Sequence, residues 1–97
     1  MTGLEAAEKL SKKYSMTMDD FIKTGTASML MEKKREFQSE RLEILSRYGI
    51  TTVEQLKERI KKGEIQEHPG WEDLIELKNI EAEIKEINSD IRDLQTA

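Results

Sequence analysis

The chain has 97 residues, the length of a single domain, and it carries 20 acidic and 16 basic side chains for a net charge of −4. Only 36% of the residues are hydrophobic and 37% are charged, so we expect a small core and a surface that a partner or a second copy helps to cover. The acidic balance does not favour nucleic acid, the lack of cysteine excludes disulfides and thiol chemistry, and no apolar run could span a membrane. We therefore expect a cytoplasmic protein with no membrane partner.

The first predicted helix covers residues 3–14, where Leu4 and Leu10 belong to a row of apolar side chains at helical spacing. A new helix start follows, because Ser15 or Thr17 can accept a hydrogen bond from the free backbone amides of a first turn.

The second predicted helix covers residues 17–47 and contains a disturbance around Gly25. Threonines flank this glycine and weaken the helix. The apolar residues also change face, because Phe21 and Ile22 lie on one arc of a regular helix and the later ones on another. The later arc consists of Leu30, Met31, Phe37, Ile44, Leu45 and Tyr48. We predict a disturbance near Gly25, a kink or a break, while the continuity of the helix there stays open. Residues 3–48 hold the N-terminal helices.

The stretch RYGITTVEQL marks the clearest boundary. Gly49 can end a helix in a left-handed conformation. A capping box then starts the next helix, formed either by Thr51 with Glu54 or by Thr52 with Gln55. The result is a short helix over 52–62 that forms a helical hairpin with the long one. Its buried stripe consists of Val53, Leu56 and Ile60.

The stretch HPGWEDLIELK, residues 68–78, holds the only histidine, proline and tryptophan of the chain. Proline is favoured at the first position of a helix, and Glu72 and Asp73 then occupy the first turn, where acidic side chains suit the helix dipole. We interpret the stretch as the start of a helix over 70–95, with Trp71 packed back onto the short helix. A small site around the histidine is the alternative, although no recognised metal-ligand spacing supports it.

The last predicted helix carries a heptad seam, with large aliphatic side chains at alternating spacings of three and four. Because burial of one such side chain contributes about 1.5–3 kcal/mol, we expect this face to be covered. The cover is either the chain's own long helix or a surface of another chain, and both remain open. The candidate partner-binding or oligomerisation residues are Trp71, Leu77, Ile80, Ile84, Ile87, Ile91 and Leu94.

Charged side chains suggest which surface lies opposite the seam. Its flanks include Glu83 and Asp90 and carry no basic residue, which suits a surface with basic edges. Lys34 and Arg41 project near the middle of the apolar arc of the long helix and could meet those acids, within the chain or across a dimer. The alternative is that their stems cover apolar surface while their charged ends reach water.

Little in the sequence points to catalysis or to a cofactor. One histidine and no cysteine leave the usual nucleophile–base pairs unavailable, and the five glycines form no phosphate-binding loop. We expect no enzyme, no metal, no cofactor and no small-molecule substrate. Nucleic-acid binding is a minor alternative, carried by basic residues of the short helix that acidic residues interrupt. These basic residues are Lys57, Arg59, Lys61 and Lys62.

Two blocks resemble small prokaryotic ribbon-helix-helix antitoxins. The stretch AAEKLSKKYSMTMDDFIKTG is similar to their helix pair, and the acidic helix over 71–95 is similar to the segment that wraps a toxin. The apolar positions that match are Leu10, Tyr14, Phe21 and Ile22. The strand that the family uses to contact DNA has no counterpart before the first helix, so the resemblance implies partner binding and not DNA binding.

Together these observations predict one all-α domain over 1–97, a small helical bundle with a long central helix, a short helical hairpin and a C-terminal coiled-coil-like helix. The first functional hypothesis is a non-enzymatic protein–protein interaction module, antitoxin-like, that engages a protein partner through its last helix. The second is a self-associating structural protein, a homodimer or a larger homo-oligomer.

Overall fold

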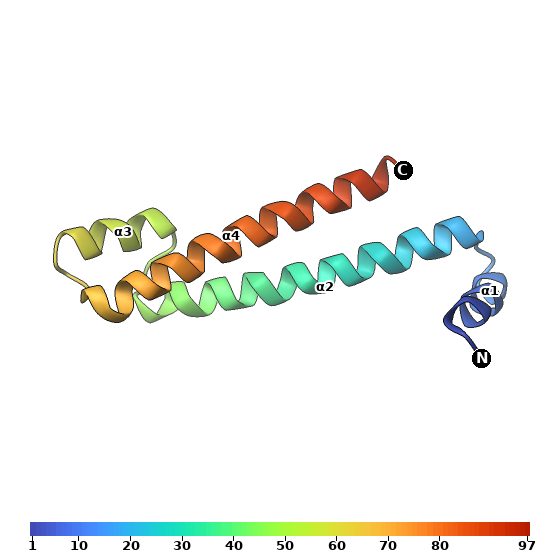
Figure 1. Cartoon of the computed structure of the whole chain (residues 1–97), viewed down its shortest axis with the longest axis horizontal. Helices are drawn as coiled ribbons and strands as arrows, with labels where there is room; N and C mark the ends of the chain where they lie inside the picture. Colours follow the sequence, from blue (N-terminus) through green and yellow to red (C-terminus); the bar gives the residue numbers. More distant parts are fainter.

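The computed structural model describes all 97 residues and consists of four helices without strands (Figure 1). These are α1 (Gly3–Lys13), α2 (Met18–Arg47), α3 (Val53–Lys61) and α4 (Glu67–Gln95). The all-α prediction, with a long helix and a long C-terminal helix, is confirmed. None of the four helices combines the length and the apolar character that crossing a membrane requires.

The long helices α2 and α4 run antiparallel, and the other two helices lie at opposite ends of this hairpin (Figure 1). At one end α3 packs beside the C-terminal turns of α2 and the N-terminal turns of α4. At the other end α1 projects beyond the start of α2. The molecule is therefore elongated, with extents of 60 × 27 × 18 Å.

Local capping sets the helix boundaries, as the sequence predicted. The Thr17 side chain accepts a hydrogen bond from the Asp20 amide at the start of α2. Thr52 and Gln55 form a complete capping box at the start of α3, which decides between the two boxes that the sequence allowed. Gly49 follows the end of α2 with a φ of 63°, a left-handed conformation that favours glycine.

The sequence left open whether the helix is broken near Gly25, and α2 is continuous from Met18 to Arg47. A glycine inside a helix costs about 1 kcal/mol relative to alanine, and packing of α2 along α4 offsets that cost. Part of the apolar surface of α2 stays uncovered. Ile22 and Met29 lie on a side of α2 that no other helix covers, and they are 52% and 49% exposed.

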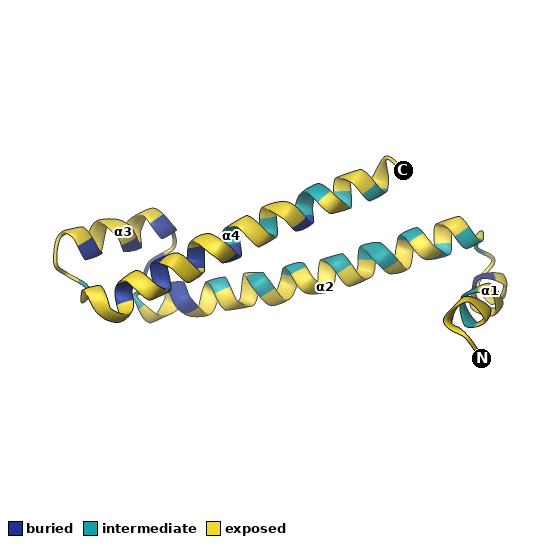
Figure 2. Cartoon of the chain, in the orientation of Figure 1, coloured by how far each residue is buried: buried dark blue, intermediate teal, exposed yellow.

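The hydrophobic core occupies one end of the hairpin, where α2, α3 and α4 meet (Figure 2). We call this the closed end. Leu56, Leu74 and Leu77 are the largest fully buried side chains, one from α3 and two from α4. The remaining core residues are Ile44, Leu45, Ile50, Val53, Ile60 and Ile80.

Beyond the reach of α3 only two helices remain side by side. We call this part the open end; it comprises residues 18–34 of α2 and 84–95 of α4, together with α1. Most of its residues are half-buried or exposed, as Figure 2 shows. The fold thus places a complete core at one end and a two-helix layer at the other.

Candidate protein-binding surface

The predicted seam of α4 is divided between the two ends of the molecule. Leu77 and Ile80 are 0% and 4% exposed and belong to the closed core, so the chain's own helices cover them. Further along α4, Ile87 is buried as well. The other three side chains of the seam are only half-buried: Ile84, Ile91 and Leu94. The part of the seam left for a partner is therefore its C-terminal part.

Trp71 is not one of the core side chains, and its predicted packing onto α3 stays a prediction. It is 36% exposed and lies outside the group of side chains that pack on the core. The residue that approaches α3 is the preceding Gly70, which is buried. A Cβ atom there would lie 3.2 Å from two side-chain atoms of Ile60 and 3.3 Å from Cγ2 of Ile65. A side chain here would push Ile60 or Ile65 aside by a few tenths of an ångström, so the close approach of α3 and α4 favours glycine.

The histidine of the same stretch marks the helix start. His68 has non-helical φ and ψ of −117° and 123° inside α4, so the regular helix begins at Pro69, as proline favours. The His68 Nδ1 atom lies 2.7 Å from Oε1 of Glu72. The pKa of the Glu72 carboxyl is lowered, first by a hydrogen bond from its own backbone amide and then by His68. No group of three metal-ligating side chains forms here or elsewhere.

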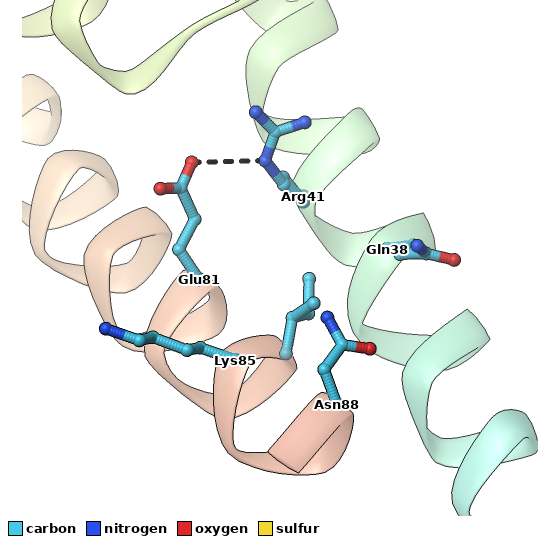
Figure 3. A pocket seen from close by; sticks show the side chains of 6 residues that line it. Gln38, Arg41, Glu81, Lys85 and Asn88 are labelled. Atoms are coloured by element: carbon cyan, nitrogen blue, oxygen red, sulfur yellow. Dashed lines mark hydrogen bonds and ion pairs between the residues drawn. The ribbon is translucent and has the colours of Figure 1, made fainter. Parts of the chain in front are cut away.

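One of the two predicted seam cations forms an ion pair with α4. Nε of Arg41 lies 3.2 Å from Oε1 of Glu81, and Figure 3 shows the two side chains reaching toward each other from α2 and α4. A pair of Arg41 with Asp90 is not formed, because Asp90 lies nine residues beyond Glu81. Nine residues are two and a half helical turns, which places the two acids on opposite sides of α4. Lys34, Glu83 and Asp90 make no ion pair, although Lys34 is half-buried.

A shallow groove of about 400 Å³ lies between α2 and α4 where the closed end gives way to the open end. The Arg41–Glu81 pair lies at this groove (Figure 3). Polar side chains form most of its walls, and Ile84 is the one hydrophobic residue. The other lining residues are Gln38, Lys85 and Asn88. The groove itself therefore offers an apolar partner little surface, although Leu42, four residues after Gln38 on α2, is 66% exposed.

The sequence did not reveal a buried polar cluster that joins the end of α2 to the start of α4. Asp73 is only 7% exposed; it accepts a short hydrogen bond from the Tyr48 hydroxyl, and Nη1 of Arg47 lies 3.4 Å from its Oδ1. Burial raises the pKa of Tyr48 to about 12, and the hydrogen bond to Asp73 adds to the shift. A neutral tyrosine that donates to a carboxylate is a structural contact between helices. The sequence did hold a signal for this buried position, because Asp73 lies four residues before Leu77 and therefore on the seam of α4.

The basic residues of α3 are largely engaged with their own chain. Arg59 donates a hydrogen bond of 3.0 Å to the Tyr48 carbonyl at the end of α2 and lies 4.0 Å from Glu64. Lys62 lies 3.5 Å from Glu58. Lys57 and Lys61 are exposed. With acids among them, these residues do not form a continuous basic surface.

Most of the exposed large hydrophobic side chains belong to the open end, seven of ten when the region around α1 is counted with it. Apart from Ile22 and Met29 of α2, three side chains of the α1 region belong to this group. Leu4 is 62% exposed, Leu10 is 38% exposed and Tyr14 is 63% exposed. Exposed apolar side chains gathered on one part of a molecule, unlike scattered ones, are typical of an interaction surface.

Comparison with known proteins extends over the whole chain. A model of the uncharacterized protein MJ0235 family matches residues 1–97. No curated protein and no solved structure matches the chain. Because the family model covers every residue of the sequence, the chain belongs to the uncharacterized protein MJ0235 family.

Proposed function

We propose that the chain is a non-enzymatic protein-interaction module that binds a protein partner through its open end. One observation carries this proposal: the aliphatic seam of α4 continues for about three helical turns beyond the core, along a stretch where only α2 covers it. The closed end has three helices and a finished core, and it holds the hairpin in shape. The open end presents apolar side chains on a preformed helical surface.

The energetics support a partner at this position. Covering one aliphatic side chain contributes about 1.5–3 kcal/mol when it passes from full exposure to full burial. Ile22 and Met29 can gain about half of that amount each, since about half of each side chain is exposed.

Antitoxin-like regulation is the narrower form of the proposal, in which the partner is a toxin. It rests on the resemblance of α1, α2 and α4 to such proteins and stays a prediction.

Site-specific photocrosslinking in the cells that produce the protein tests the proposal. A photoreactive phenylalanine analogue replaces Ile22 or Leu94 at the open end, and Leu42, which is 66% exposed, provides the matched control on the closed half of α2. We expect protein adducts from the first two positions and none from Leu42 after irradiation. Absence of adducts at both Ile22 and Leu94 would contradict a protein-binding role for the open end.

A further inference from the structure

We infer that the protein bound at the open end is a second copy of this chain, and that the two open ends form a two-fold symmetric four-helix arrangement. This inference rests on the proposed function and names the partner. Its elements are α2 and α4 from each copy, packed through one particular side of the hairpin.

The layered structure of the molecule gives the first reason. The groove between α2 and α4 is covered by a third helix, α3, at the closed end only. At the open end Ile84, Ile91 and Leu94 stay half-buried between two helices. Two antiparallel two-helix layers placed face to face give a four-helix bundle, which closes such a seam from both sides.

The exposed area gives the second reason. The chain exposes 7063 Å², whereas a compact protein of its mass of 11.3 kDa exposes about 5,700 Å². The excess of roughly 1,400 Å² is more than the 800 Å² or so that each partner buries in a standard interface. The radius of gyration of 19.5 Å, against about 12.5 Å for a compact chain of this length, reflects the same extended open end.

Helical geometry identifies the side that docks. Gln38 of α2 and Lys85 of α4 both line the groove in Figure 3 and therefore mark one side of the hairpin. Met29 and Leu94 each lie nine residues from one of these markers, on the opposite side of their helices. Ile22 lies seven residues before Met29 and shares its side. Ile22, Met29 and Leu94 thus lie on one side of the open end, which we call the apolar flank. Met31, which is 39% exposed, lies on the other side, seven residues before Gln38.

Charges along this flank suit a second copy. Glu83 and Asp90 lie on the same side of α4 as Leu94 and make no ion pair within the chain. On α2, Lys33 lies toward the same side, and its only ion pair is an exposed one at 3.5 Å to Glu36. The flank therefore carries Lys33 among the acids Glu36, Glu83 and Asp90, and a two-fold axis can bring Lys33 of one copy toward Glu83 or Asp90 of the other.

Sedimentation equilibrium of the purified full chain tests this inference, because it measures mass independently of the elongated shape. We expect a mass of twice 11.3 kDa at high concentration and dissociation on dilution. The double variant Ile22→Asp/Met29→Asp should sediment as a monomer. The control Leu42→Asp/Ile75→Asp, whose side chains are 66% and 59% exposed on the closed half, should remain dimeric. Circular dichroism checks that both variants keep their helices.

A monomeric wild-type chain at every concentration would overturn the inference, and so would an Ile22→Asp/Met29→Asp variant that dimerises as well as the control. Neither result decides the proposed function. If Ile22 then crosslinks to a different protein in cells, the open end still binds a partner and only its identity was wrong. If Ile22 and Leu94 give no adduct at all, the proposed function itself fails.

Discussion

At the scale of single residues, the contact between Tyr48 and Asp73 joins the two long helices across the closed end. A buried carboxylate is costly unless it is paired or hydrogen-bonded. Here the Tyr48 hydroxyl and the Arg47 guanidinium together satisfy Asp73. Every other buried polar side-chain atom of the chain also has a hydrogen-bond partner. The arrangement holds only while the tyrosine keeps its proton, because a phenolate beside the carboxylate would repel it.

This requirement predicts how stability depends on alkaline pH. The pKa of Tyr48 is about 12 in the folded chain and about 10 in an unfolded one. Between these values the folded state holds more protons than the unfolded state, so the free energy of unfolding falls as pH rises from about 10 to 12. We expect urea titrations at several pH values to show this fall in the wild type and a smaller one in Tyr48→Phe.

The difference in pH dependence between the wild type and Tyr48→Phe separates the contribution of Tyr48 from that of the lysines, which titrate in the same range. At neutral pH, Tyr48→Phe should already cost about 1–3 kcal/mol, because it leaves the buried carboxylate with one donor fewer. If the free energy of unfolding depends on pH equally in both proteins, the hydrogen bond to Asp73 does not keep the Tyr48 hydroxyl protonated.

At the scale of helices, the sequence reveals features that neighbouring residues determine, but not features that depend on contacts between distant segments. The Thr52–Gln55 capping box and the turn at Gly49 depend on neighbouring residues, and the sequence predicted both. The sequence left open whether α2 continues through Gly25, because the local helix propensity is weak there and the packing of α2 along α4 is a distant contact. Asp73 meets a partner 25 residues distant, and its acidic first-turn position gave the simpler explanation.

The division of the α4 seam also depends on distant contacts. Heptad spacing identified the aliphatic side chains, but spacing is the same before and after the end of the core. Only the position and length of α3 decide that Leu77 is covered within the chain and Leu94 is not. The candidate surface could therefore be predicted as a helix face but not as an open end.

Paired glycine substitutions test the continuity of α2. A Cβ at Gly25 meets no atom within 4 Å, and its φ is not left-handed. Gly25→Ala should therefore stabilise the chain by about 0.5–1 kcal/mol, through better helix propensity and a less flexible unfolded state. Gly49→Ala should destabilise it by about 1–2 kcal/mol, because φ is 63° there. Urea unfolding measures both, and a Gly25→Ala variant less stable than the wild type would indicate a break in α2.

At the scale of the whole molecule, the two ends should differ in stability. The closed end has three helices around buried side chains, so its amides open only when the chain unfolds. The open end has two helices and a half-buried seam, so in a single chain it can open locally at a lower free energy. Association of two copies would raise the stability of the open end with concentration and leave the closed end much less affected.

Hydrogen exchange followed by mass spectrometry tests this difference directly. In the wild type at high concentration, we expect amides of residues 22–34 and 87–94 to be protected, and dilution should increase their exchange. In Ile22→Asp/Met29→Asp the same segments should exchange fast at every concentration, whereas residues 53–61 and 74–80 should exchange equally slowly in both proteins. The closed end thereby serves as an internal control for folding. Equal exchange of the open end in the wild type and the variant would mean that no second copy covers the apolar flank.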